Sequence, residues 1–384
     1  MADNTLSGLI VTIYSALNTI AREQIGFIPA VRKFAFPGRK VAQNEPITFP
    51  IVPAFAEPTD VSASNVIADP AGIVVANDTM TMANVKQISW GWNGEEATGL
   101  GNSGIFATTQ EDAFKQAFRA HTNQIEAGLA GLYKYASRAQ GAVGTIPFNT
   151  VDNLTDLSET RRILEDNGMW FDGKMKMVLS NRAMSNLRGK QTVVFKANEA
   201  GTREMQLTGV VTQLEGWNLH QSGQIASHTK GAGTGYVSDG GEPLGETTVK
   251  VKTGSGTIVA GDVILNEHDT DNLYVVNSNL SGANFSIGKP GLLVALPDGD
   301  DITLKNSYIA NMAFNEDALV LISALPNLPE GGDQAVARTT VQDPISGLLF
   351  EVSEYKGYRK VIYVVAAAWG VKCIKTEGVA LLLQ

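Results

Sequence analysis

The chain has 384 residues and a net charge of −9, which is long enough for two or three domains. Charged residues make up only 18% of it, below the usual fraction of about a quarter, and the negative balance argues against tight nucleic-acid binding. A single cysteine, Cys373, excludes an internal disulfide framework. The sequence contains no signal-peptide pattern and no apolar run that spans a bilayer, so we expect a soluble protein made in a cytoplasm.

Residues 1–44 are predicted to form an amino-terminal arm. Apolar residues recur at helical spacing over Leu6–Ile20, which predicts a short amphipathic helix. The stretch that follows is irregular and basic, with Arg32, Lys33, Arg39 and Lys40. Because proline and glycine keep this stretch from folding on itself, two interpretations stay open: a solvated loop, or an arm that docks on an acidic neighbour or an internal partner.

Residues 45–95 predict a long β-hairpin studded with proline. Ile47–Val52, Ile73–Val75 and Thr79–Met82 are strand-like, and prolines confine the segment to edges and loops. A hairpin without its own core is marginal alone and needs something to lie on. Its acidic residues outnumber its basic ones, so it complements the basic arm before it, and in a homo-oligomer each could meet the other's copy.

Residues 96–150 carry the clearest helical signal of the chain, predicted over Thr108–Ala139. Thr108 or Thr109 can cap its start, and Arg138 and Gly141 suit its end. One apolar stripe is predicted to face the core, and it consists of Phe114, Phe118, His121, Ile125, Leu129, Leu132 and Ala136.

Residues 151–222 mix helix and strand. Helices are predicted at Leu157–Asn167, with Ser158 as its cap, and at Asn181–Gly189. Strands are predicted at Met175–Leu179, Met205–Val211 and Leu214–Leu219. Because there is no strict alternation of strand and helix, an α+β class is favoured over a doubly wound sheet.

Residues 223–305 change in character and predict an inserted, small all-β domain, a barrel or a sandwich. The segment begins with a stretch rich in glycine, serine and threonine, which we interpret as a hinge-like linker. Closely spaced strand patterns follow, at Thr248–Val251, Ile258–Leu265, Leu273–Val276, Phe285–Ile287, Leu292–Leu296 and Ile302–Leu304.

Residues 306–384 return to the main body. Ala318–Ala324 predicts a buried strand, Leu348–Tyr355 alternates, and Val379–Leu383 closes the chain. The apolar run Arg359–Ala368 could be a helix or a strand, because its length alone does not distinguish the two.

No catalytic, cofactor-binding or metal-binding residues are predicted. The four histidines lack metal-ligand spacing, and Cys373 fits a small buried hydrophobe. Gly231, Gly233 and Gly235 resemble a phosphate loop in composition only. The four histidines are His121, His220, His228 and His268. The acidic cluster Asp298, Asp300 and Asp301 lacks the later glutamate of a calcium loop and fits an acidic turn.

Taken in order, these segments resemble the major capsid (coat) proteins of tailed double-stranded DNA phages, most of all those of short-tailed phages with an inserted β-domain. Four stretches carry the resemblance: EDAFKQAF…IEAGLAGLY, GVVTQLEGWNLHQS, FNEDALVLISALP and GYRKVIYVVAAAWGVKCIKTEGVALLL. The resemblance implies a Hong Kong 97-type fold with an amino-terminal arm (1–44), an extended loop (45–95), a peripheral domain with the spine helix 108–139 (96–150), an axial domain (151–222), the insert (223–305) and a carboxyl-terminal axial and peripheral part (306–384).

The resemblance further implies a structural protein of the virion and no enzyme. Copies would form pentamers and hexamers of an icosahedral shell around packaged DNA, which the acidic chain would not bind specifically. Implied partners are the chain itself, a scaffolding protein and a portal, without a membrane or a cofactor. Two alternatives stay open: an encapsulin-like compartment with an enzyme cargo, and, from the predicted insert alone, a carbohydrate-binding or hydrolytic β-rich protein.

Overall fold

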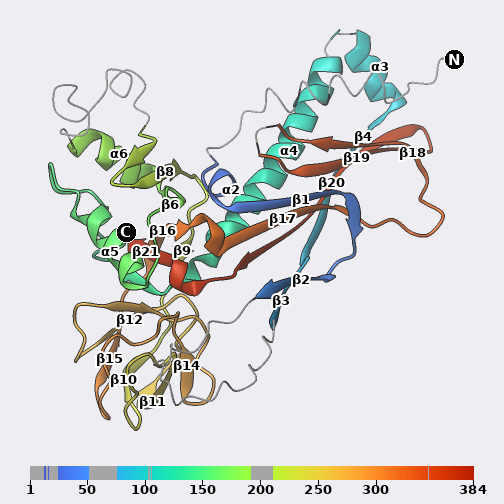
Figure 1. Ribbon diagram of the computed structural model, residues 1–384. Helices are drawn as coiled ribbons and strands as arrows, with labels where there is room; N and C mark the ends of the chain where they lie inside the picture. The colour runs from blue at the N-terminus through green and yellow to red at the C-terminus, as the bar shows by residue number, and fades with distance from the viewer. Residues whose placement is uncertain are drawn as a thin grey trace, which may run out of the picture.

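The computed structural model describes residues 25–51, 76–191 except 103 and 105, and 211–384 except 345, together with Ile13 and Ala16. These residues form an α+β protein, as the sequence predicts. Figure 1 shows two parts, which we call the body and the lobe. The lobe comprises residues 234–304, from β10 to β15, and the body comprises the other described residues.

The first sheet of the body, the platform, is built around the long strand β20. This strand pairs with β4 along one edge, and along the other edge with β19 and then β17. The run Val361–Val365 consists of β-branched residues and one aromatic residue, Tyr363, and this composition explains why the apolar stretch forms a strand. The platform has the order β1-β17-β20-β19-β18 with β4 beside β20, and its strands are β1 (Arg32–Val41), β4 (Asn84–Asn93), β17 (Leu319–Pro326), β18 (Ala335–Gln342), β19 (Leu349–Gly357) and β20 (Lys360–Cys373).

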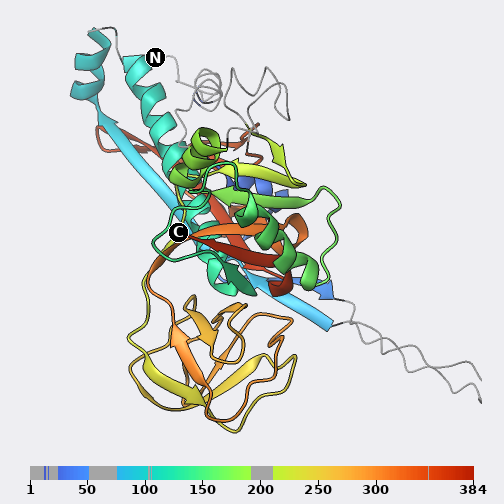
Figure 2. The same cartoon turned by 90° about the vertical axis from the view of Figure 1, so that its left-hand side faces the viewer.

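The long helix α4 (Phe106–Ala130) covers one face of the platform. Its 25 residues span about 37 Å at about 1.5 Å per residue, and Figure 2 shows it running alongside β4. The predicted apolar stripe is confirmed as buried from Phe114 to Leu132. The predicted end at Ala139 is wrong: a 3-10 turn, η1 (Gly131–Tyr135), follows, and Arg138–Gln140 is strand β5.

A sheet ladder explains the early end of α4. Strand β5 pairs with β21 (Val379–Leu383) on one side and with β13 (Leu273–Val275) on the other, and this pairing outweighs the local helical pattern. The predicted caps Thr108 and Thr109 lie inside α4, which begins at Phe106. A shorter helix, α3 (Gly94–Asn102), precedes it.

The second sheet joins the rest of the body to the lobe. Its central strand β16 (Tyr308–Asn315) pairs with β21 and with β6 (Met175–Leu179), and β6 pairs with β8 (Trp217–Gln221). The predicted single strand Leu214–Leu219 is instead two strands, β7 (Gln213–Leu214) and β8, around a turn at Glu215–Gly216. β9 (Ser227–His228) also pairs with β16.

Two helices cover this part of the body. Helix α5 (Thr155–Asp166) begins before the predicted cap Ser158, and the side chain of Asn153 accepts from the Thr155 amide instead, at 2.8 Å. Helix α6 (Asn181–Lys190) follows β6 as predicted, and Ser180 caps it by accepting from the Ala183 amide. The predicted strand Met205–Val211 lies outside the described residues except for Val211.

The lobe extends away from the body (Figure 2) and has a hydrophobic core of its own, which includes Tyr236, Val249, Phe285 and Ile302. The predicted strand Leu292–Leu296 is wrong, since only Leu296 forms an isolated bridge, with Glu242. The strands of the lobe are β10 (Thr234–Ser238), β11 (Thr248–Ser255), β12 (Val263–Asn266), β13, β14 (Asn284–Ser286) and β15 (Asp301–Leu304).

The amino-terminal segment is part of the body rather than an irregular arm. Short helix α2 (Phe27–Ala30) packs in the main core, and β1 pairs with β17 in parallel. The register shifts between Ala35 and Lys40, across Pro37 and Gly38, so a bulge accommodates the two residues that argued against a strand. Of the predicted helix Leu6–Ile20, only Ile13 and Ala16 are described, and both are helical and buried.

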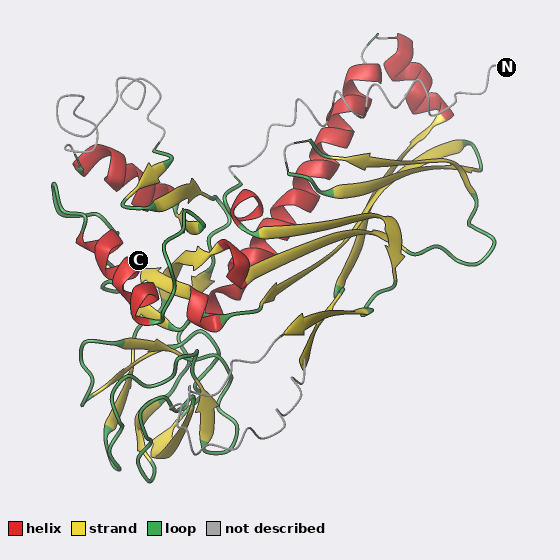
Figure 3. Cartoon of the chain, viewed as in Figure 1, coloured by secondary structure: helices red, strands yellow, loops and turns green. Residues whose placement is uncertain are grey.

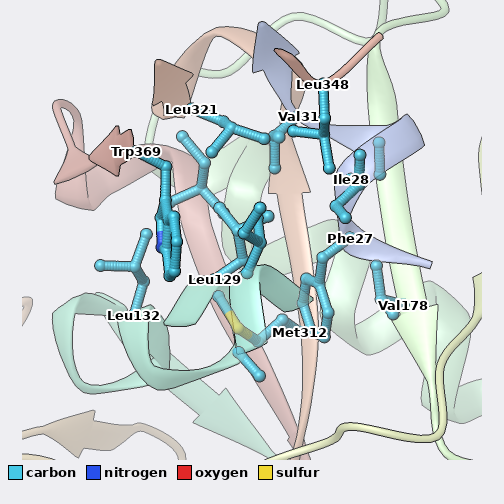
Figure 4. Close-up of a cluster of buried hydrophobic side chains, with 14 of the residues drawn as sticks. Phe27, Ile28, Val31, Leu129, Leu132, Val178, Met312, Leu321, Leu348 and Trp369 are labelled. Atoms are coloured by element: carbon cyan, nitrogen blue, oxygen red, sulfur yellow. The ribbon is translucent and has the colours of Figure 1, made fainter. Parts of the chain in front are cut away.

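The main core lies between α4, the platform and the second sheet. Figure 4 shows Phe27 and Ile28 of α2 beside Val178 of β6 and Met312 of β16, with Leu129 and Trp369 nearby. Figure 3 shows the long helix α4 beside the strands of the platform. Two 3-10 turns, η2 (Glu316–Ala318) and η3 (Thr376–Gly378), close the edge of the core.

Candidate functional site

A two-stranded hairpin stands outside both large sheets. β2 (Pro46–Ile51) and β3 (Ala76–Thr81) pair in antiparallel register from Pro46↔Thr81 to Ile51↔Ala76. Residues 52–75, which contain the predicted strand Ile73–Val75, lie outside the described residues. Pro46 and Pro50 are tolerated because a two-stranded sheet consists of edges only.

The base of the hairpin packs on the platform of its own chain. Ile47, Met80 and Met82 are buried against Val320 and Ile322. Lys372 forms an ion pair with Asp78 and donates to the Thr79 carbonyl at 2.7 Å. The expectation that this segment lacks burial within its own chain is therefore wrong at its base, although the opposite face, with Thr48 and Thr79, is exposed.

A groove lies at the distal end of the platform, between α3, the start of α4 and the hairpin that joins β19 to β20. It has a volume of about 780 Å³. Its floor is aromatic: the Trp92 ring meets the Phe106 ring edge-on at 5.9 Å, and Tyr363 adds a third ring. Local sequence reasoning missed this site because pairing of β4 with β20 brings residues 92–110 and 354–363 together.

The four histidines are dispersed and serve the fold. His121 is packed and hydrogen-bonded as predicted, with Nε2 3.1 Å from the Val365 carbonyl, and burial lowers its pKa. His268 contacts Asp300 at 2.7 Å. Burial also lowers the pKa of His220. Within the described ranges, no three His, Cys, Asp or Glu side chains are arranged to hold a metal ion.

His228 belongs to a buried polar network at the junction of the body and the lobe. Its Nδ1 lies 2.8 Å from the Tyr133 hydroxyl of η1, and its Nε2 lies 2.9 Å from Asp262. Asp262 also accepts from the amides of Gly231 and Val259, at 2.9 and 2.8 Å. The network fastens three segments of the chain without leaving the carboxylate unpaired.

The glycine-rich stretch is a packed part of the structure and not a linker. A Cβ on Gly231 would lie 2.3 Å from the Thr257 carbonyl oxygen, so only glycine fits there. Gly233 donates to the same oxygen, and Gly235 lies in β10. The prediction of a hinge-like linker is therefore wrong.

The remaining predicted residues have structural contacts. Asp298 pairs with Lys252 and accepts from the Gly240 amide, which suits an acidic turn. Asp301 begins β15. Burial raises the pKa of the Cys373 thiol to about 12, so almost none of it is thiolate, the nucleophilic form, at neutral pH.

A buried carboxylate joins the amino-terminal segment to α4. Glu126 is fully buried and accepts from the amides of Phe27 and Ile28, at 3.1 and 2.8 Å, and from the Ser222 hydroxyl at 3.1 Å. Burial raises its pKa, and the two amides oppose that shift. The residue fastens α2 to the last turns of the long helix.

The chain was compared with known proteins by sequence and by structure. A scan of protein-family models finds no match, and a search of the curated proteins finds none either. Within the described residues, no helix has the length and apolarity that crossing a membrane requires.

Many solved structures of phage capsids match along the chain. A chain from the capsid of the cyanophage P-SCSP1u is 10% identical, with a TM-score of 0.49, and the match covers 94% of this chain and 88% of that one. A chain of Mycobacterium phage Che8 is 10% identical, with a TM-score of 0.48, over 94% and 91%. A virus-like particle from Pyrococcus furiosus is 8% identical, with a TM-score of 0.42, over 98% of both chains.

Proposed function

We propose that this chain is a shell-forming protein, the major capsid protein of a tailed double-stranded DNA phage. The observation that carries the proposal is the hairpin β2–β3, which stands outside both large sheets and leaves its face with Thr48 and Thr79 exposed. A two-stranded hairpin is marginal by itself and gains burial when copies pack together. The sequence resemblance described above favours the same function, which is mechanical and not enzymatic.

The geometry suggests how one copy reaches its neighbours. The hairpin β2–β3 is anchored at its base by Met80 and Met82, and its paired strands leave the platform. The 24 residues between β2 and β3, 52–75, include Phe55 and Val61 and carry three acidic residues without lysine or arginine. Such a segment gains most by lying on another copy, where both its apolar and its acidic residues find partners.

The proposal assigns the parts of a Hong Kong 97-type fold to this chain. Residues 1–44 form the amino-terminal region, 45–95 the extended loop, and 96–150 the peripheral domain with its spine helix. Residues 151–222 begin the axial domain, 223–305 form an inserted β-domain, and 306–384 complete the axial and peripheral domains. The lobe's own core supports the assignment of the insert.

Pentamers and hexamers of the chain would form an icosahedral shell in the virion, after synthesis in the bacterial host cytoplasm. The net charge of −9 suits a wall that holds packaged DNA without binding its phosphates. A scaffolding protein and a portal are the further partners that such a shell requires. No membrane takes part in this assembly.

Electron microscopy of the purified protein tests the proposal directly. We expect closed particles, on the order of tens of nanometres across, in which each copy forms interfaces of at least standard size with its neighbours. A chain that stays monomeric in sedimentation under every assembly condition contradicts the proposal. Nuclease-resistant DNA inside the native particle supports a capsid, whereas an enclosed enzyme supports the encapsulin-like alternative.

A deletion tests the extended loop separately. The segment Pro53–Ala71 lies between the paired strands β2 and β3 in the sequence, so its removal spares the buried base of the hairpin. We expect unchanged circular dichroism and thermal unfolding of the monomer, but loss of shell assembly. Normal shells from this deletion refute the bridging role.

A further inference from the structure

Strand β18 is an edge of the platform, and within the described part of the chain it pairs with β19 alone. The Asp343 amide, one residue past its end, donates to the Leu348 carbonyl at 2.9 Å. Because bonded and non-bonded pairs alternate in an antiparallel ladder, the odd-numbered residues from 337 to 341 bond to β19. The Leu349 amide agrees with this phase, since it turns away from β18 and donates to the Ser323 hydroxyl at 3.0 Å. The even-numbered residues of β18 therefore turn their backbone groups outward.

The outward backbone groups are those of Arg338, Thr340 and Gln342. Thr340 and Gln342 are exposed, and Arg338 is half-buried. No other segment among the described residues forms backbone hydrogen bonds to these three. A row of open N–H and C=O groups along a strand is a template for a further strand.

The other edges of the platform have features that oppose strand addition, and β18 has few of them. β1 is interrupted around Pro37, and β4 carries the exposed Lys86. Proline, lysine and irregular pairing are the usual protection of sheet edges. The sequence of β18, AVARTTVQ, contains neither proline nor lysine. Its one charge, Arg338, pairs within the chain with Asp333 at 2.6 Å and with Glu351 at 3.1 Å.

We propose that β18 of one copy pairs with β18 of a second copy, antiparallel across a two-fold axis, so that two platforms form one continuous sheet. The inference rests on the proposed self-assembly and names one of its contacts. Such a contact is isologous, because both copies contribute the same strand, and it closes on two copies.

The outward groups and the charge together select one register. Outward-bonding residues must face each other, so the two-fold axis passes beside a single residue of each strand. An axis at Arg338 would set two guanidinium groups opposite each other, and like charges directly opposite are destabilising. An axis at Thr340 would pair only residues 338–342, and an axis before Arg338 would meet the bulge between Ala335 and Ala337. The axis at Thr339 pairs residues 336–342 and avoids both faults.

In this register the facing side chains are compatible. Thr339 faces Thr339 of the second copy in a non-hydrogen-bonded pair, where the Cα atoms lie about 4.5 Å apart. Arg338 faces Thr340 of the second copy, and these two residues exchange backbone hydrogen bonds. Val336, which is 54% exposed, faces Gln342 and loses apolar surface to solvent.

A symmetric cysteine tests the register on the full chain. Thr339→Cys chains are oxidised mildly under assembly conditions, and we expect a covalent homodimer, since disulfides form at Cα separations of about 4.4–6.8 Å. Thr340→Cys is the matched control, because the two cysteines are then diagonal neighbours about 7–8 Å apart, and it should form little dimer. The wild-type chain, whose one cysteine is Cys373, gives the background.

Three substitutions at Thr340 give an independent readout of association by sedimentation. Thr340→Lys sets a cation opposite Arg338 of the second copy, twice by symmetry, and should weaken association about tenfold. Thr340→Glu changes the same exposed position but meets Arg338 with an opposite charge, so association should be retained. Thr340→Pro removes an outward N–H that β19 does not use, so association should weaken at least about tenfold while the circular dichroism of the monomer is unchanged.

The outcomes separate this contact from the proposed function. Closed wild-type shells, with no Thr339→Cys dimer and with normal assembly of Thr340→Pro, overturn the contact alone. A Thr339→Cys dimer from chains that never close into shells supports the contact while the proposed function fails. Equal dimer from Thr339→Cys and Thr340→Cys overturns the register. A Thr339→Cys dimer that appears only after removal of Pro53–Ala71 overturns the contact, since that segment then occupies the edge.

Discussion

In the body, the main core is assembled from segments as distant as Phe27 and Leu383, whereas every residue of the lobe core lies between Tyr236 and Leu304. The body therefore depends on pairings that close very long loops, such as β1 with β17. The pairings among β10–β15 lie within residues 234–304; those of β10 with β11 and of β12 with β13 close short loops, and that of β10 with β15 joins the two ends of the segment. Short loops cost less entropy to close, so the lobe suits a unit that folds by itself.

Tryptophan separates the two parts experimentally. All five tryptophans lie in the body and the lobe contains none. Tryptophan fluorescence therefore follows unfolding of the body, while circular dichroism follows both parts. Each prediction below uses this difference to break or sharpen the contrast between body and lobe.

The largest effect is expected from Phe118→Ala. The ring is fully buried and meets Phe350 edge-on at 5.0 Å. Its loss should reduce the free energy of unfolding of the body by about 3–5 kcal/mol, seen as a lower urea midpoint in tryptophan fluorescence. The matched variant Phe285→Ala, in the lobe core, should leave that midpoint in place and shift only the dichroism. Equal shifts of both signals by both variants would show one cooperative unit instead.

The second largest effect is expected at the junction between the body and the lobe. Asp262→Ala leaves the amides of Gly231 and Val259 and the ring of His228 without their acceptor. Removing a buried, hydrogen-bonded carboxylate of this kind lowers the free energy of unfolding by about 3 kcal/mol. We expect the dichroism of the lobe to change at lower urea, with faster proteolysis near Gly231.

Asp301→Ala is the control for the junction, because Asp301 is exposed and lies on the same lobe. Its effect should stay within about 0.5 kcal/mol. If the two aspartate variants unfold alike, the buried network does not hold the lobe.

Sequence patterns predicted those parts whose burial is decided locally. The stripe of α4 and the strands β6, β17 and β21 follow from residue spacing and apolar runs, and the structure confirms them. The patterns failed where a distant partner decides. Arg138 fits a helix end by sequence, but its segment pairs with β21 and β13.

The same cause limited the prediction of surfaces. The basic stretch at Arg32 was interpreted as a loop or docking arm, yet Arg32 pairs with Asp317 of its own chain at 3.1 Å. The stretch around Gly231 looked like a linker because its partner, Thr257, follows much later. Trp92 and Tyr363 of the groove meet through strand pairing that no local pattern contains.

The smallest effect concerns Glu126, which tests how the amino-terminal segment is held to the body. Glu126→Gln keeps one acceptor oxygen where the carboxylate has two, so one amide of α2 loses its partner at a cost of about 1 kcal/mol. The comparison of interest is pH dependence, because burial raises the pKa of Glu126 in the folded chain.

A raised pKa means that the folded chain binds more protons than the unfolded chain between the two pKa values. The contribution of Glu126 to stability is therefore fully present below its unfolded pKa, about 4.3, and falls as the pH rises through the folded pKa. The free energy of unfolding of the wild-type body, minus that of Glu126→Gln, should decrease from pH 4 upward. A difference that rises with pH would mean that the amides of Phe27 and Ile28 outweigh burial and hold the ionised carboxylate.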